Sequence, residues 1–340
     1  MQKKIRSIFL VFLITEIFFS ATKIHAQILP SYGNSRTGGS GMQFLKNHFD
    51  ARSTGMSGAV VGLINDASAL YWNPAGITKV DTAKVHVMIS RVSYFANINS
   101  NFAAIVFKPG KLSYVGISVI SMNYGDNDET TEYQPNGTGR KLILGNTLFG
   151  LSYAKILTNN FSFGLSAKWA NEVLTNVVTN NFLFDIGLTY DVGINYSRFG
   201  VSFSNFGLNV SPEGEVKILN LYKEQNVNTF QEISAPGFFR LGFAFDPFHQ
   251  KDNILTLAGQ LNHPTDNNET LAIGAEYSWR KTFYGRSGWE FGSDEPSAFP
   301  SVGVGFKLLR NFGGISVDYS LVNKTRLGNV NRLTLSFLIK

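Results

Sequence analysis

The chain has 340 residues, of which 44% are hydrophobic, 14% are aromatic and 16% are charged, and its formal net charge is +6. The abundant aromatic residues and the low charge exclude a disordered chain, and the absence of cysteine excludes a disulfide scaffold and a cysteine nucleophile. The mean hydropathy of −0.01 argues against a helical membrane protein, and the 33 glycines together with the aromatic bias favour a β-barrel.

The first residues have the features of a secretory signal peptide. Three cations between residues 3 and 6 precede an apolar stretch over 8–14, and Ala26 stands before the expected cleavage site. A transmembrane anchor is the alternative, but the apolar run ends before Glu16 and is too short to span a bilayer. We therefore predict that residues 1–26 are a signal peptide that is cleaved during export.

Residues 27–82 do not alternate between apolar and polar positions, and they contain many small residues that suit short helices. Asn73 followed by Pro74 is typical of a helix start, and the simplest interpretation of this pair is a helix cap. A wide barrel, however, encloses a volume that must be filled unless it is a pore. We therefore predict that 27–82 form an N-terminal helical hatch, or plug. Its motif residues are Asp66, Ser68, Trp72, Asn73, Pro74, Ala75 and Gly76.

From residue 83 onward, apolar positions alternate with polar or glycine positions in segments separated by turn residues. A period of two with one apolar face indicates strands of a sheet with one face in apolar surroundings. The segments have about the length of a tilted membrane-spanning strand. The fourteen predicted strands are 83–91, 101–109, 111–121, 142–155, 160–172, 179–192, 197–207, 236–246, 251–262, 269–280, 282–292, 299–309, 312–322 and 330–340.

The connections between these strands also suit an outer-membrane barrel, which places long loops outside the cell and short turns in the periplasm. The two longest connections, 122–141 and 208–235, follow strands three and seven, whereas the tight turn 108–111 follows strand two. We therefore predict an all-β fold, a fourteen-stranded antiparallel transmembrane barrel over 83–340 in the lipid of the outer membrane. A soluble β-sandwich or barrel is the alternative, because periodicity alone does not tell which face is outward.

The polar face of the strands would line the barrel interior. Charges inside a barrel are tolerated when they are paired or hydrated, and inward glycines indicate that something packs against the wall. The predicted interior charges are Lys168, Asp185, Arg240, Glu276, Arg286, Glu290, Lys307, Asp318 and Arg332.

The sequence shows no pattern that points to catalysis. No two histidines have metal-like spacing, and no G-x-S-x-G nucleophile motif is present. The glycines of 137–141 lack the spacing of a phosphate loop, and the acidic residues of 126–132 lack that of a calcium-binding loop. We expect no enzyme activity, metal, cofactor or nucleic-acid partner.

Several stretches resemble the PorV/PorQ family. They are 51–59 (ARSTGMSGA), 65–76 (NDASALYWNPAG), whose Asn-Pro-Ala triplet is the clearest mark, and two near the C-terminus, 275–280 and 327–337. That family looks like a branch of the FadL-type barrels with fourteen strands. The resemblance implies a role in the type IX protein secretion system. There, PorV-like members carry cargo with a C-terminal sorting domain from the translocon to the attachment complex, and PorQ-like members belong to that complex.

Two functions follow from these predictions. In the first, the extracellular loops bind sorting-domain cargo or subunits of the translocon or attachment complex. The candidate partner-binding residues are Tyr133, Leu219, Leu221, Tyr222 and Phe230. In the alternative, the protein is a FadL-like channel for a small hydrophobic ligand, and the hatch near Asn73 moves to let it pass. The charged inner face favours the first function, because such a ligand needs an apolar pocket. A passive porin is disfavoured, since the hatch would block it.

Overall fold

The computed structural model describes residues 39–80, 84–220, 223–293, 297–311, 313–325 and 328–339. The predicted signal peptide and the first part of the predicted hatch segment, 27–38, lie outside the described residues.

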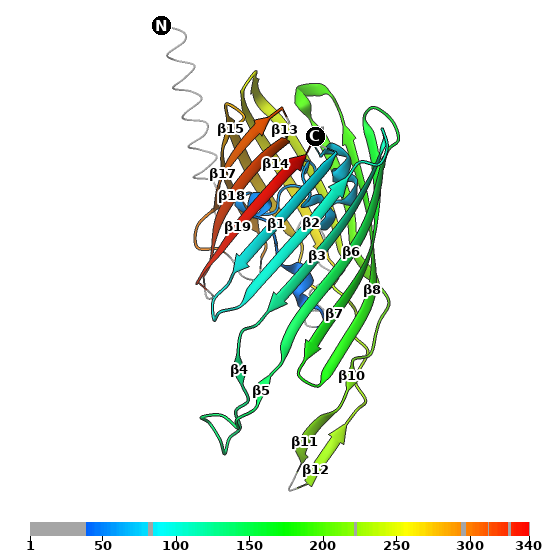
Figure 1. Ribbon diagram of the computed structural model, residues 1–340, viewed down its shortest axis with the longest axis vertical. Coiled ribbons are helices and arrows are strands. Elements are labelled where there is room, and N and C mark those ends of the chain that lie inside the picture. Colours follow the sequence, from blue (N-terminus) through cyan, green and yellow to red (C-terminus); the bar gives the residue numbers. More distant parts are fainter. Residues whose placement is uncertain are drawn as a thin grey trace. The chain divides into compact units, whose positions relative to one another are not determined.

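In the described part of the chain, fourteen antiparallel strands form one closed barrel (Figure 1). Each barrel strand pairs with the next one along the chain, and the first and last strands pair with each other to close the ring. The predicted fold class is therefore confirmed. The barrel strands are β1 (Val85–Ser93), β2 (Asn99–Phe107), β3 (Ser113–Asn123), β6 (Leu144–Ile156), β7 (Phe161–Leu174), β8 (Val177–Asp191), β9 (Arg198–Gly207), β13 (Phe238–Gln250), β14 (Asn253–Pro264), β15 (Thr270–Trp279), β16 (Phe283–Phe291), β17 (Ser301–Arg310), β18 (Gly313–Lys324) and β19 (Gly328–Ile339).

The strand ends agree with the sequence-based predictions to within two residues, except in β13. This strand runs to Gln250, four residues beyond its predicted end. The extension contains Pro247, which has no N–H for the sheet, and the register against β14 shifts between Phe245 and Phe248. A bulge accommodates the proline, so the strand continues where the sequence predicts a stop.

The apolar rows of the strands point away from the barrel axis. Phe182, Val304 and Leu151 expose 69%, 61% and 58% of their surface, whereas their inward neighbours are buried. A soluble protein would bury such rows. The alternative of a soluble sandwich or barrel is therefore wrong, since the apolar face of the strands is outside and their polar face is inside.

The two ends of the barrel differ (Figure 1). The two longest connections lie at the end opposite to the C-terminus, which we call the long-loop end. Short turns occupy the other end, called here the short-turn end. The long connections contain β4 (Asn127–Asp128), β5 (Lys141–Leu142), β10 (Glu213–Gly214), β11 (Val216–Asn220) and β12 (Lys223–Val227), in which β4 pairs with β5 and β11 with β12. One short turn contains the 3-10 helix η4 (Ile194–Tyr196).

Residues 39–80, which we call the hatch, lie inside the barrel (Figure 1). They form η2 (Gln43–Lys46), α2 (Ala51–Gly55), α3 (Ala69–Trp72) and η3 (Pro74–Lys79). The helix α2 packs on β16 to β19, and η3 packs on β3 and β6 to β8. Among the described residues, no helix has the length and apolar character needed to cross a membrane.

The hatch backbone approaches the barrel wall at inward-facing glycines. A β-carbon on Gly164 of β7 would overlap the backbone nitrogen of Ala75, and one on Gly200 of β9 would overlap the carbonyl of Val61. The same is true of Gly187, Gly242, Gly274, Gly288 and Gly303, each of which faces a hatch atom within 3.2 Å of such a β-carbon. The inward glycines therefore make room for the hatch, which confirms the prediction that something packs against the wall.

These contacts predict the effect of filling a glycine position. Gly164→Ala should loosen the hatch and lower the free energy of unfolding by about 1–3 kcal/mol, the usual effect of overpacking a filled interior. Thermal unfolding and single-channel conductance in planar bilayers measure the two effects.

The matched control is Gly259→Ala, because no atom lies within 4 Å of a β-carbon built on Gly259. Equal stability and equal conductance for the two variants would show that the glycine contacts do not seal the lumen.

Candidate functional site

Two helix caps define the local structure of the hatch. Asp50 caps α2 by accepting from the Ser53 N–H (2.7 Å), and it also accepts from the Trp72 indole N–H (2.9 Å). Asn73 caps η3 by accepting from the Ala75 N–H (3.1 Å), as the Asn-Pro pair predicts. Its amide also donates to the Leu188 carbonyl of β8 (3.0 Å), so the cap is at the same time a link to the wall.

The remaining predicted motif residues lie around these caps, and all of them except the half-buried Asp66 are buried. Asp66 accepts hydrogen bonds from the backbone and hydroxyl of Ser68. Pro74 and Ala75 lie against the glycines of β7 and β8, while a β-carbon on Gly76 would meet Ile64 at 2.6 Å. The structure therefore brings the whole predicted motif into one packed region in contact with the wall.

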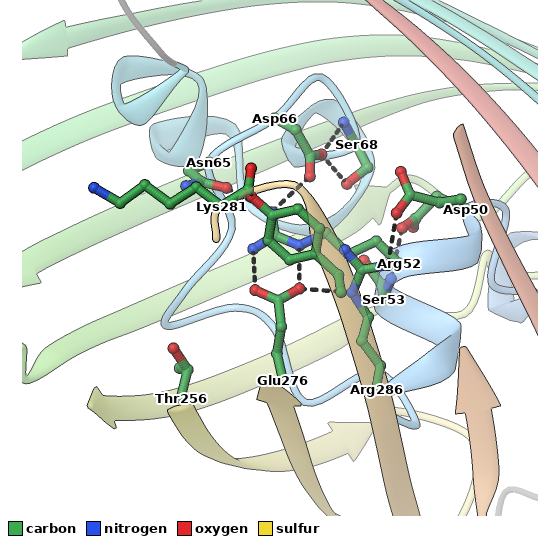
Figure 2. Close-up of polar contacts among 12 residues, drawn as sticks. Asp50, Arg52, Ser53, Asn65, Asp66, Ser68, Thr256, Glu276, Lys281 and Arg286 are labelled. Carbon is green, nitrogen blue, oxygen red and sulfur yellow. Dashed lines mark hydrogen bonds and ion pairs between the residues drawn. The ribbon is translucent and has the colours of Figure 1, made fainter. Parts of the chain in front are cut away.

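The centre of the site is an ion network between the hatch and the wall (Figure 2). Arg52 of α2 binds both oxygens of Glu276 on β15, with Nε and Nη2 each 3.0 Å away, and its Nη1 donates to Asp66 at 2.8 Å. Arg286 of β16 shares Glu276 (2.6 Å) and also binds Asp318 of β18 (2.6 Å). Two guanidinium groups and three carboxylates thus join the hatch to three wall strands.

The electrostatics of the hatch side chains fit this arrangement. Burial by itself would raise the pKa of Asp66, but the Arg52 guanidinium and the hydrogen bonds from Ser68 outweigh it and lower the pKa below its usual value. Burial, reinforced by the nearby Arg332, lowers the pKa of His48 well below its usual value. Asp66 is therefore a carboxylate and His48 a neutral ring at neutral pH.

A cavity of about 500 Å³ borders this network on the side of the short-turn end. Its lining includes Arg52 and Asp66 from the hatch, and Glu276, Arg286 and Lys281 from the wall and its turn (Figure 2). Lys79 at the end of η3 also lines it and forms an ion pair with Asp191 of β8. Charges of both signs line the cavity, together with apolar side chains such as Leu63 and Met88.

An apolar cluster lies between the hatch and strands β2, β3 and β6. Phe49 of the hatch lies 5.2 Å from the Tyr71 ring and 6.5 Å from the Phe102 ring, between ring centres. Ile120 of β3 and Leu148 of β6 complete this cluster, and all five side chains are buried. The hatch therefore contacts the wall through an apolar cluster as well as through the ion network, and nearer the long loops its Lys46 forms an ion pair with Asp266 (2.8 Å).

The other predicted interior charges also serve as wall or hatch contacts. Lys168 forms an ion pair with Asp185 on the neighbouring strand. Arg240 donates to the Ser204 hydroxyl (2.6 Å) and lies 5.3 Å from the Trp72 ring centre, and Arg332 donates to the His48 carbonyl (3.0 Å). Two members of the predicted set, Glu290 and Lys307, are only half-buried.

The predicted partner-binding residues are not brought together in the described structure. Tyr133 is 88% exposed in the connection between β3 and β6, and Phe230 is half-buried in the connection between β9 and β13. Leu221, Tyr222 and the side chain of Leu219 lie outside the described residues.

Sequence reasoning missed several residues that hold the hatch. Arg52 stands in the family-like stretch but was not predicted as a site residue, and Gln260 of β14 accepts from the Val60 and Val61 N–H groups (3.0 and 2.9 Å). Their partners are distant in the sequence, so no local spacing could reveal them. In the described residues, no group of three or more acidic or histidine side chains could hold a metal ion.

Comparison with known proteins supports the fold. No family model matches the chain, and no curated protein matches its sequence. Among solved structures, the Ralstonia pickettii toluene transporter TbuX is similar, with a TM-score of 0.59 and 14% identity over 86% of this chain and 98% of that one. A Pseudomonas aeruginosa FadL homologue is also similar, with a TM-score of 0.55 and 12% identity over 86% of this chain and 98% of that one. The Pseudomonas putida toluene transporter TodX has a TM-score of 0.54 and 11% identity over 82% of this chain and 95% of that one.

At these identities the similarity concerns the fold alone. The FadL-like part of the predicted resemblance is confirmed at that level. Membership of the PorV/PorQ family stays a prediction.

The ion network generates a prediction about Glu276. Glu276→Gln leaves two buried guanidinium groups without their shared carboxylate, which should lower the free energy of unfolding by about 3–5 kcal/mol. It should also speed amide hydrogen exchange over 51–57. Urea unfolding and exchange mass spectrometry measure these changes.

Asp126→Asn is the control, because it removes one partner of an exposed ion pair with Lys141 and should change little. If both variants have the stability of the parent protein, the network does not anchor the hatch.

Proposed function

We propose that the protein is an outer-membrane channel for a small hydrophobic molecule, exported by its cleaved N-terminal signal peptide. The exposed apolar rows and the FadL-like fold support a location in the lipid of the outer membrane. The titles of two similar structures name toluene transporters, and a small apolar molecule is the corresponding ligand class for this chain.

The observation that carries this proposal is the closed hatch, which packs on apolar side chains of the wall. A passive porin needs a water-filled lumen, whereas the hatch backbone of this protein touches glycines of β7, β8, β9, β13, β15, β16 and β17. Moving the hatch away from the wall uncovers Phe49, Phe102, Ile120 and Leu148, which are apolar and are buried while the hatch is closed. Such a surface suits a hydrophobic ligand rather than a sugar or an ion.

From the sequence, we expected the charged interior to argue against a hydrophobic ligand. The structure removes this objection. Glu276, Arg286 and Asp318 are engaged with one another and with Arg52 of the hatch. They therefore anchor the hatch and do not line a binding site for the ligand on the loop side. Passage then requires the hatch to move away from the wall.

A reversible crosslink tests whether passage needs hatch movement. The hydroxyl oxygens of Ser57 in the hatch and Ser301 in β17 are 2.8 Å apart, and the chain has no cysteine of its own. Ser57→Cys combined with Ser301→Cys should form a disulfide that holds the hatch against the wall. We expect oxidation to abolish uptake of radiolabelled toluene by cells that carry this variant, and reduction to restore it.

The two single-cysteine variants are the controls for oxidation itself. If cells with the parent protein take up no more toluene than a deletion strain, the channel function is refuted. Uptake that persists in the crosslinked protein would refute hatch movement but leave the channel function standing.

A role in type IX secretion is the second candidate function, and the two hairpins at the long-loop end favour it. The β4–β5 and β11–β12 hairpins extend beyond the barrel strands (Figure 1). Tyr133, between β4 and β5, is almost fully exposed, and exposed aromatic residues on such a projection suit a protein partner. The proposed partners are sorting-domain cargo and subunits of the translocon or attachment complex.

Removing the β11–β12 hairpin separates the two functions. Deletion of residues 216–227 should reduce anchoring of sorting-domain cargo at the cell surface, measured by mass spectrometry of secreted and surface proteins. Toluene uptake should remain, because the deleted hairpin lies outside the barrel. Unchanged cargo anchoring in both the hairpin deletion and the full gene deletion would eliminate the secretion role.

A further inference from the structure

The short-turn end of the barrel carries a ring of exposed cations. They occur next to the start of β1 and in or beside five of the six short turns, so that they surround the barrel instead of gathering on one side. The exposed cations of this ring are Lys84, Lys108, Lys111, Lys155, Lys251, Arg280, Lys281 and Arg310.

Carboxylates do not balance this ring. Among the described residues of the six short turns, Asp252 is the one exposed carboxylate. Asp191 and Asp246 lie at the same end, but each forms an ion pair with a cation outside the ring, Lys79 and Arg198 respectively. The ring therefore presents a net positive charge to its surroundings.

The long-loop end has the opposite character. The exposed carboxylates in the described residues of its two longest connections are Asp126, Asp128, Glu132, Glu213, Glu215 and Glu232, while the exposed cations there are Arg140, Lys141 and Lys217. The exposed charges of the described residues are thus distributed unevenly along the barrel axis, with the excess of cations at the short-turn end.

The cations stand where the lipid-facing surface ends. In β6, Lys155 follows the outward side chains Leu151 and Tyr153, and in β17, Arg310 follows Leu308 in the same outward row. The Arg280 guanidinium lies 5.0 Å from the ring centre of the outward-facing Trp279. An aromatic residue followed by a cation is the arrangement found at the level of lipid headgroups, where the long side chain reaches the polar layer.

We propose that this ring binds the headgroups of anionic phospholipids in the leaflet that faces the short turns. The proposal depends on the membrane location put forward under the proposed function, and it is independent of what the channel carries. A leaflet of anionic lipids attracts clustered lysine and arginine side chains at its surface. A ring around the whole barrel fits a surrounding lipid surface, whereas an acidic protein would be expected to match a patch on one side.

Trp279 provides a direct measurement of this lipid contact, because it lies beside the ring. The protein is reconstituted in vesicles that contain either brominated phosphatidylglycerol or brominated phosphatidylcholine. The quenching of Trp279 is the difference between the fluorescence quenching of the parent protein and that of Trp279→Phe. We expect the anionic lipid to quench several-fold more effectively at equal content. High salt should remove the difference, because it screens exposed charges.

Two matched triple variants test the assignment to the ring. Lys251→Gln, Lys281→Gln and Arg310→Gln, in the turns nearest Trp279, should abolish the preference for phosphatidylglycerol. The control combines Arg140→Gln, Lys141→Gln and Lys217→Gln at the long-loop end, and it should keep the preference. Soluble glycerol phosphate should not compete, since the partner is a lipid surface and not a free phosphate.

The outcomes separate this proposal from the proposed function. Equal quenching by the two lipids, or equal loss of preference in both variants, overturns the lipid ring while leaving the protein in the membrane. An acidic periplasmic protein that binds the ring and abolishes the preference at equal lipid content also overturns it. Absence of quenching by either lipid would instead overturn the membrane location.

Discussion

The structure depends on one constraint, which is that fourteen strands enclose more space than their own inward side chains can fill. Either water or another part of the chain must occupy that space. In this protein, wall positions such as Gly164 and Gly200 carry no side chain, and the hatch backbone lies directly against them. The wall glycines and the small residues of the hatch therefore fit each other in shape. A larger side chain on either one requires a compensating change in the other.

The barrel could be predicted because its signals are local. Each strand can be recognised from its own residues, because apolar positions alternate with polar or glycine positions. Most strand ends agree with the prediction. The exception in β13 has a physical reason, since a bulge around Pro247 lets the strand continue. The cap formed by Asn73 was equally predictable, because its acceptor and donor are two residues apart.

The anchoring of the hatch could not be predicted, because its partners are distant in the sequence. Arg52 and Glu276 are separated by 224 residues, and Asn73 and Leu188 by 115. Only the closure of the barrel around the hatch brings these groups together. The inward charges were visible in the sequence, but whether they line an open channel or anchor a hatch depends on Arg52, whose role no local pattern reveals.

Two kinds of contact hold the hatch against the wall, an apolar cluster and an ion network. In the apolar cluster, Phe49 packs on Phe102 and its apolar neighbours, contacts that an apolar molecule can replace without leaving a polar group unsatisfied. In the ion network, Arg52 and Glu276 border a cavity lined by charges of both signs, where water can solvate the charges as they separate. A dry ion pair would resist separation far more strongly. In the proposed channel function, the hatch is firmly seated at rest and is displaced when an apolar ligand arrives from the loops.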